Sequence, residues 1–524
     1  MSLIGKFATV GGATMASRVA GFAREALIGA ALGAGPVADA FYAAFRFPNL
    51  FRRLFAEGAF NTAFIPLFAK ELEGGGHSAA RKFAEEVASV LIAALLLLSG
   101  VAILFMPVLV GTIIAPAFAA DPEKFDLTVV LTRIMFPYLF CMSLVAMLSG
   151  ILNSMRRYFL AAIVPVLLNI ILIGVLVVAL QAGWDQRSVG LGLAWGVFAS
   201  GVAQLLLLVW GVKQAGFSMK PRLPRLTPQV KTLLVLMGPA LLTGGVTQIN
   251  LLVGQIIASW QAGAIALLNY ADRINQLPLG VIGIAIGVVL LPELARSLKA
   301  GNDEDAQHLQ NRSLEFALGL SLPAAIGLMI LPGPIVNILY ERGAFTAETT
   351  AMTAAALAAF ASGLPAYVLI KVFSPAFFAR LDMKTPMWFS IVAVVVNIAA
   401  SLILFPIIGH IGIALATSFS AWINFALLAG TLWLRNDFRP SATTLRRVAM
   451  IVLASLAMGA VIWGLQAVLA GWLASGAFLV RLAGVGLIIG VGAALYFALT
   501  IATGAVDRTQ LKRLLRRQRG AAGE

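Results

Sequence analysis

The chain has 524 residues, of which 60% are hydrophobic and 12% are charged. Ordinary globular chains have about 45–50% apolar and about 25% charged residues, so this composition excludes a soluble protein. One cysteine excludes a disulfide framework, a Cys-rich zinc site and an iron–sulfur cluster, and three scattered histidines are too few for a histidine metal site. The net charge of +15 is better explained by the positive-inside rule than by nucleic-acid binding, because the basic residues lie mostly between apolar blocks.

Apolar stretches long enough to cross a membrane follow one another along the chain, since a spanning helix needs about 20 mainly apolar residues. Two segments with internal charges, 2–31 and 36–70, come first, and the start lacks the pattern of a cleaved signal peptide. Eight charge-free stretches predict one span each: Val87–Ala120, Ile134–Met155, Tyr158–Trp184, Ser188–Val212, Phe316–Tyr340, Thr349–Ile370, Val448–Val480 and Leu482–Val506. Thr232–Ala271 and Thr385–Leu434 predict two spans each, with breaks near Gly263 and at Gly409. We therefore expect an all-α polytopic membrane protein with about 14 transmembrane helices.

Basic residues in the loops set the expected orientation. About two thirds of the 38 basic residues fall in the loops and tail on the side of the N-terminus. Only Lys124, Arg187, Arg342 and Arg481 fall in loops on the other side. We therefore expect both termini of this multi-pass membrane protein to be cytoplasmic. The basic tail, residues 507–524, is expected to lie on anionic lipid headgroups and not on nucleic acid.

The sequence repeats itself with a shift of about 226–228 residues. Six spans per copy make the two copies parallel, as in transporters built from two like halves. The expected domains are an N-lobe at 1–213, a cytoplasmic linker at 214–230, a C-lobe at 231–436, two extra helices at 437–506 and the tail at 507–524. The landmarks that keep register are Ile65–Leu72 with Leu291–Leu298, Pro137 with Pro365, and Asn169 with Asn397.

Charged residues inside the predicted spans point to an aqueous cavity, because an intramembrane cation is costly. Helical spacing places Arg46, Asn49 and Arg53 on one face and Arg52 beside Asn49. Adjacent Arg24 and Glu25 are not expected to face one another on a regular helix. The cations, which outnumber the acids, are Arg18, Arg24, Arg46, Arg52, Arg53, Arg133, Arg273 and Lys371, and the candidate acidic partners are Glu25, Asp39, Glu57 and Asp272.

Surplus arginine suits an anion, since the planar guanidinium grips phosphate oxygens with two donors. We assign Arg24, Arg52 and Arg273 to the cavity. Arg46 and Arg53 are better explained as structural ion pairs or interfacial side chains. Two assignments stay open: Lys371 is either cavity-lining or close to the inner surface, and Asp272 is either a local charge balance for Arg273 or a switchable partner.

Motifs for covalent catalysis are absent from the sequence. It contains neither a G-x-x-x-x-G-K-[ST] phosphate loop nor an H-E-x-x-H metal motif. We therefore expect a transporter that is not an enzyme, needs no cofactor, and is driven by the membrane potential, by an ion gradient (Na⁺ or H⁺), or by both.

The run Arg46–Pro66 resembles the signature of the MurJ (MviN) family of lipid II flippases in the MOP superfamily. Ser149–Asn153, Asn269–Arg273, Tyr340–Phe345 and Ser374–Pro386 are similar to that family too. The resemblance covers essentially the whole chain and implies twelve helices in two lobes plus two C-terminal helices that form a hydrophobic groove. It implies transport of undecaprenyl-pyrophosphoryl-MurNAc-pentapeptide-GlcNAc from the cytoplasmic to the periplasmic leaflet of the bacterial inner (cytoplasmic) membrane, which we expect to proceed by alternating access. Membrane lipids and cell-wall synthesis and division proteins are the expected partners.

The same resemblance implies substrate-binding roles in a central cavity for Arg18, Arg24, Arg52, Arg273, Asn49, Ser17 and Lys371. It leaves Glu25, Asp39, Glu57 and Asp272 as gating or charge partners. Gln276 stands where some relatives have an acidic residue, and the carboxylates of a sodium site reported among relatives have no match here, so no metal ligands are assigned. Two other classes remain as alternatives: a MATE-like multidrug or ion antiporter, expected to need carboxylates for cationic drugs, and a non-transporting scaffold for cell-wall synthesis.

Overall fold

The computed structural model describes residues 3–54, 60–220 and 222–505, and within them the chain folds into helices and turns without a strand. Ten helical segments in this part of the chain are long and apolar enough to cross a membrane. The other four expected spans correspond to α1 (Leu3–Leu32), α2 (Pro36–Phe51), α9 (Pro228–Ala258) and α10 (Ala264–Lys299). The all-α architecture is confirmed, and the count of fourteen spans stays a prediction.

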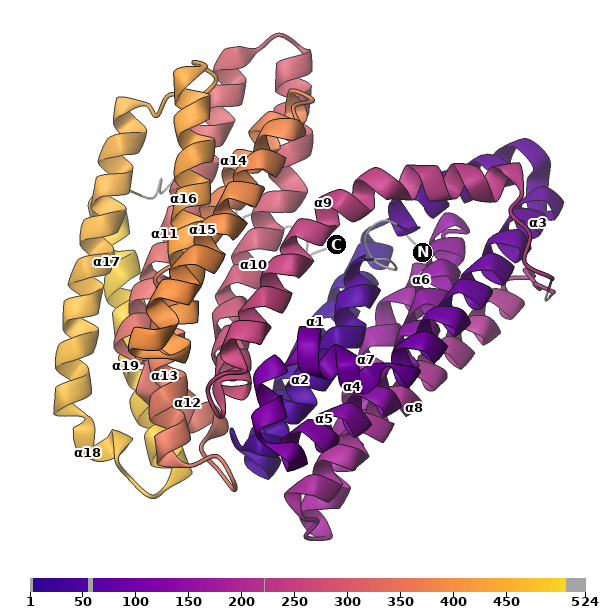
Figure 1. Cartoon of the computed structure of the whole chain (residues 1–524). Helices are drawn as coiled ribbons and strands as arrows, with labels where there is room; N and C mark the ends of the chain where they lie inside the picture. The colour runs from indigo at the N-terminus through magenta and orange to yellow at the C-terminus, as the bar shows by residue number, and fades with distance from the viewer. Residues whose placement is uncertain (1–2, 55–59, 221, 506–524) are drawn as a thin grey trace. The chain divides into compact units, whose positions relative to one another are not determined.

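The first compact unit comprises residues 1–269 together with 342–346 (Figure 1). Within it α1 packs on α7, α7 on α8, α6 on α8, α2 on α5, α3 on α6, and α9 on α3. Besides α1, α2, α9 and the start of α10, its elements are α3 (Asn61–Leu104), α4 (Met106–Leu109), η2 (Val110–Ile114), η3 (Pro116–Ala120), α5 (Pro122–Met135), α6 (Tyr138–Ser154), α7 (Tyr158–Gln181) and α8 (Gln186–Gln214).

The second compact unit comprises residues 270–341 and 347–524, of which the structure describes those up to 505. Here α15 packs on α16, α11 on α14 and α17, α14 and α13 on α16, and α17 on α19. Besides most of α10, its elements are α11 (Asp303–Ile330), α12 (Pro332–Tyr340), α13 (Ala347–Ala361), α14 (Leu364–Ala379), α15 (Lys384–Ile408), α16 (His410–Leu434), α17 (Ala442–Val468), α18 (Ala470–Leu473) and α19 (Phe478–Ala502).

The two predicted breaks between paired spans are confirmed. α9 ends at Ala258 and α10 begins at Ala264, so the chain turns at the expected place near Gly263. α15 ends at Ile408, and Gly409 has a φ of 59° before α16 begins at His410. The expected lobe boundaries were drawn from the repeat and stay predictions. The two compact units divide the chain differently from the expected lobes, because α9 belongs to the first unit and the repeat placed it in the C-lobe.

Helix starts in the loops carry the capping residues that helices favour. Asp121 caps α5 by accepting from the Lys124 backbone N–H (3.2 Å), and Thr227 and Ser441 cap α9 and α17 in the same way. Asp185 caps α8, and its hydrogen bond from the Ser188 hydroxyl is the main cause that lowers the pKa of the Asp185 carboxyl.

The expected linker lies on α3. The buried Glu85 carboxylate accepts from the Lys220 backbone N–H (2.8 Å) and from Arg222 Nε (2.5 Å). Thr227 at the start of α9 donates its hydroxyl to Glu86 (2.8 Å). These contacts fix both the linker and the first turn of α9 to the same helix of the first unit.

Backbones meet directly where α1 ends. Gly33 and Gly343 both have φ of 58°, and a Cβ at either would overlap a backbone carbonyl oxygen, of Ala344 and of Ala30 respectively. The Ala344 N–H donates to the Ala30 carbonyl (2.8 Å). Only glycine combines the left-handed backbone with this close approach. The short segment 342–346 is thereby held against α1 within the first unit.

Candidate functional site

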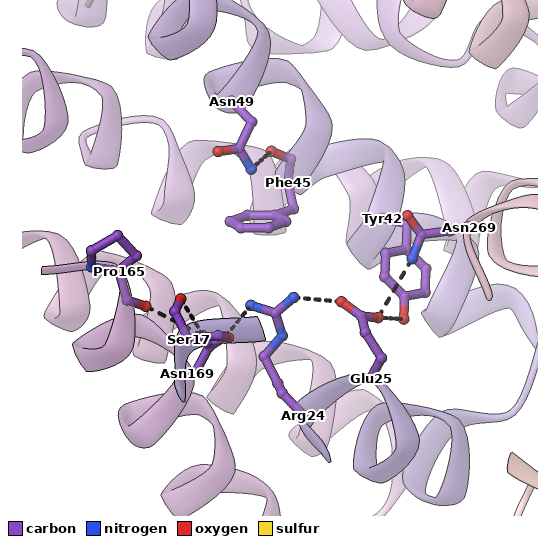
Figure 2. A network of polar contacts seen from close by, with 9 residues as sticks. All are labelled: Ser17, Arg24, Glu25, Tyr42, Phe45, Asn49, Pro165, Asn169 and Asn269. Atoms are coloured by element: carbon purple, nitrogen blue, oxygen red, sulfur yellow. Dashed lines mark hydrogen bonds and ion pairs between the residues drawn. The ribbon is translucent and has the colours of Figure 1, made fainter. Parts of the chain in front are cut away.

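Arg24 lies at the centre of a buried polar network in the first unit (Figure 2). Its Nη1 donates to Asn169 Oδ1 on α7 (2.9 Å), and its Nη2 donates to Glu25 Oε1. The other Glu25 oxygen accepts from the Tyr42 hydroxyl on α2 (2.7 Å) and from Asn269 Nδ2 (3.5 Å). Arg24 is 6% exposed and Glu25 is 2% exposed, so both charges are compensated inside the unit.

The expectation that Arg24 and Glu25 would not face one another is wrong. Their Cα atoms are about 100° apart around α1, as the helical period requires. The arginine side chain is long enough to reach back across that angle, and the Asn169 amide holds it in this position.

Ser17 joins the same network, about two turns before Arg24 on α1. Asn169 Nδ2 donates to the Ser17 backbone oxygen (3.0 Å) and lies 3.4 Å from the Ser17 hydroxyl oxygen. Arg18, on the next residue of α1, is exposed. Gly21 lies between Ser17 and Arg24, and a Cβ there would make ordinary contact with the Asn169 amide at 3.6 Å. The packing of α1 on α7 therefore leaves room for a Cβ at this position.

Arg52 and Asn49 are in contact as their spacing predicts. Arg52 Nε donates to Asn49 Oδ1 (3.0 Å), and Asn49 Nδ2 donates to the Phe45 carbonyl (3.0 Å). Both side chains are half-buried, and Figure 2 shows Asn49 and Phe45 on the same side of Arg24. Glu57, one of the candidate acidic partners, lies outside the described residues.

Asp39 pairs with a lysine and not with an arginine of the predicted set. Its Oδ2 accepts from Lys124 Nζ (2.7 Å), and the ammonium also lies 3.9 Å from the centre of the Phe118 ring. The same carboxylate accepts from the Gly263 and Ala266 backbone N–H groups at the start of α10 (2.7 and 3.0 Å). Asp39 is 0% and Lys124 8% exposed, so this is a fully desolvated pair.

The remaining candidates belong to the second unit. Arg273 and Asp272 are half-buried on α10, and Asp272 accepts from Gln276 one turn further along. Gln276 therefore supplies a hydrogen bond to Asp272. Lys371 is exposed on α14. Among the described residues, no group of three or more His, Cys, Asp or Glu side chains is arranged to hold a metal ion.

Sequence reasoning missed three residues that complete these networks: Asn169, Tyr42 and Lys124. Asn169 was used only as a repeat landmark, although an amide inside an apolar span is itself a sign of a polar partner. Lys124 was counted as a loop residue, whereas the structure buries it in the first turn of α5.

A family model described as Lipid II flippase MurJ matches residues 28–484. A probable lipid II flippase MurJ of Rhizobium tropici is 53% identical over 99% of this chain and 98% of its own length. The chain belongs to the lipid II flippase MurJ family. Lipid II flippase MurJ of Burkholderia cenocepacia is 36% identical over 87% of this chain and 89% of its own length. Family membership makes the chain a lipid flippase, a transporter that is not an enzyme.

Solved structures agree with this assignment. A lipid II flippase MurJ in an inward closed conformation is similar with a TM-score of 0.77 and 26% identity, over 94% of this chain and 97% of that one. An inward-facing MATE multidrug transporter of the MOP superfamily has a TM-score of 0.64 and 15% identity, over 83% and 95%. The second likeness concerns the fold alone. The drug-exporter and scaffold alternatives are not favoured.

Proposed function

We propose that this chain moves lipid II from the cytoplasmic to the outer leaflet of the bacterial inner membrane by alternating access, with both termini cytoplasmic. The observation that carries the proposal is the buried Arg24 network, joined to membership of the MurJ family. A polyprenyl pyrophosphate headgroup is too polar to cross hydrocarbon unaided, so a carrier must replace its hydration with charge-assisted hydrogen bonds.

Arg24 is proposed to hold the pyrophosphate by exchanging one anionic acceptor for another. Glu25 occupies Arg24 Nη2 in this structure, and a phosphate oxygen has the same charge and acceptor geometry as a carboxylate oxygen. The released Glu25 would keep its hydrogen bonds from Tyr42 and Asn269. Substrate binding therefore exchanges one hydrogen bond of Arg24, while Glu25 loses this contact with its cation and keeps two neutral donors.

Further contacts are proposed for Arg18, Arg52 with Asn49, and Ser17 in the first unit, and for Arg273 and Lys371 in the second. Arg52 is already oriented by the hydrogen bond that its Nε donates to Asn49. Glu57, Asp39 and Asp272 are proposed as gating or charge partners. Cell-wall synthesis and division proteins are proposed partners of the flippase.

The energy source is proposed to be the membrane potential, an ion gradient of Na⁺ or H⁺, or both, without a cofactor. A potential that is positive outside favours outward movement of negative charge by about 2.3 kcal/mol per charge per 100 mV. Lipid II carries several negative charges, so this term acts in the direction of the proposed transport.

Vesicles containing the purified chain and labelled lipid II test the function directly. We expect lipid II to become accessible on the opposite leaflet at a rate that rises with imposed potential. The orientation of the inserted protein is measured with Ser218→Cys and Asp185→Cys, which should react with impermeant reagents on opposite faces. Transport of cationic drugs without lipid II movement would support the antiporter, and no transport of either would support the scaffold.

An apolar cavity in the second unit is proposed to hold the polyprenyl tail. It has a volume of 330 Å³ and lies among α11, α17 and α19, the last two being the helices outside the duplication. Its lining includes Pro323 and Gly327 of α11, Met458 and Ile462 of α17, and Ala493 and Tyr496 of α19. The alternative is that α17 and α19 only pack against the second lobe and do not hold the lipid tail.

Filling this cavity is expected to weaken tail binding. A Cβ at Gly327 meets nothing within 4 Å, so Gly327→Leu places a side chain in the cavity without a backbone clash. We expect photo-crosslinks from a labelled lipid tail to map to α17 and α19 in the unchanged chain and to fall several-fold in this variant. Gly430→Leu on α16 is equally open and does not line the cavity, so it is the matched control. Crosslinks confined to other helices would contradict the assignment.

A further inference from the structure

The Arg24–Glu25 pair in Figure 2 is held by a third group at each end. Asn169 Oδ1 accepts a hydrogen bond from Arg24 Nη1 (2.9 Å), and the Tyr42 hydroxyl donates one to Glu25 Oε2 (2.7 Å). The contact between the two charges therefore runs from Arg24 Nη2 to Glu25 Oε1. Arginine prefers to bind a carboxylate through two parallel hydrogen bonds. Here only one of these two bonds forms between Arg24 and Glu25, because Arg24 Nη1 donates to Asn169 instead.

A closed two-point pair would compete strongly with substrate. Breaking a buried ion pair is costly when each charge is left without a partner. Here Asn169 and Tyr42 keep the outer atoms satisfied, so only the central hydrogen bond has to be exchanged. The Arg24 guanidinium thus donates to two different acceptors: the Asn169 amide oxygen, which is permanent, and the Glu25 carboxylate, which is exchangeable.

We propose that Asn169 is a positioning residue for anion recognition: it keeps Arg24 in one-point contact with Glu25, so that a phosphate group can replace the carboxylate. The inference rests on the proposed role of Arg24 in binding the pyrophosphate. Asn169 acts through Arg24 and need not touch the substrate.

The position of Asn169 is itself fixed by several hydrogen bonds. Its Nδ2 donates to the Ser17 backbone oxygen (3.0 Å) and to the Pro165 carbonyl of its own helix (3.3 Å), and the residue is 5% exposed. The amide oxygen is thereby turned toward Arg24. Its counterpart in the repeat, Asn397, accepts from the Ser401 and Thr417 hydroxyls (both 3.4 Å).

Asn169→Ala and Asn169→Leu test the proposal in the purified full chain, with farnesyl pyrophosphate as the soluble probe. The leucine variant keeps nearly the same shape and suits an apolar span. Without the amide, Arg24 closes on Glu25 with both nitrogens, and we expect the Kd for the probe to rise about tenfold, as for a lost hydrogen bond of typical strength. Adding Glu25→Gln removes the competing carboxylate, and we expect it to restore binding to within about threefold of the unchanged chain.

Rescue by Glu25→Gln separates positioning from simple packing of α1 on α7, because a packing defect would persist in the double variant. The matched control is Gln204→Ala, which removes another buried amide, 1% exposed, on the neighbouring helix α8. It should leave the Kd unchanged. An unchanged Kd in both Asn169 variants, or a lack of rescue, would overturn the inference. Arg24→Ala tests the proposed function separately: if that variant still bound the probe, the role of Arg24 itself would be wrong.

Discussion

Replacing Arg24 by alanine is expected to lower lipid II flipping about a hundredfold or more. The substitution removes the positive charge of the guanidinium and the charge-assisted hydrogen bond that Nη2 is proposed to donate to the pyrophosphate, and a bond of this kind is worth about 1.5–3 kcal/mol. Arg24→Lys should keep part of the activity, because lysine keeps the charge and loses the planar fork. The measurement is the rate at which labelled lipid II reaches the opposite leaflet in vesicles.

Two controls make the Arg24 result interpretable. Arg24→Ala alone leaves Glu25 buried without its cation, so the double variant with Glu25→Gln should restore normal protein yield but not flipping. Arg133→Ala removes another arginine from an apolar segment of the same unit, an exposed one whose Nε donates to the Ile103 carbonyl. We expect Arg133→Ala to flip lipid II normally. Equal losses in the Arg133 and Arg24 variants would show that general charge, and not this site, controls transport.

Asp39→Ala is expected to lower the free energy of unfolding by about 3–5 kcal/mol, the usual cost of stranding a buried charge. The variant leaves the Lys124 ammonium desolvated and removes the acceptor of the Gly263 and Ala266 N–H groups. Lys124→Met should cost less, because Asp39 keeps those two donors at the start of α10, where a helix N-terminus stabilises negative charge. Thermal unfolding in detergent measures the ranking.

The partly exposed pair Asp382–Arg435 provides the matched control for Asp39. Hydrogen bonds from Arg435 and then from Thr385 lower the pKa of the Asp382 carboxyl to about 2, so the pair stays charged from neutral pH down to about 4. Its contribution would be lost only as the pH falls through that lowered pKa. Because both side chains are solvated, Asp382→Ala should change stability by less than about 1 kcal/mol. A Lys124→Met variant as unstable as Asp39→Ala would contradict the role given to the backbone donors.

Local patterns in the sequence predicted local features well. Apolar runs located the long helices, glycines located the breaks at Gly263 and Gly409, and a three-residue spacing predicted the Arg52–Asn49 hydrogen bond. Each of these depends on residues close together in the chain, where the helical period fixes the geometry.

The partners of the charged residues were not predictable in the same way. Arg24 meets Asn169 and Asp39 meets Lys124 across 145 and 85 residues of sequence, and no local period relates such positions. Helical angles alone also misjudged Arg24 and Glu25, since they describe Cα positions and not the reach of a long side chain. A charge or an amide in an apolar span indicates that a polar partner exists, but it does not identify that partner.

The glycine contact between the end of α1 and residues 342–346 has a consequence for the order of synthesis. Domains generally fold as units from the N-terminus as the chain is made. The continuous part of the first unit ends at Asn269, yet its contact with Ala30 comes from Ala344, after α10, α11 and α12. α10, α11 and α12 are therefore synthesised before the Ala30 carbonyl of the first unit can accept its hydrogen bond from Ala344. Until then the Ala30 carbonyl lacks this donor, because Ala344 has not yet been translated.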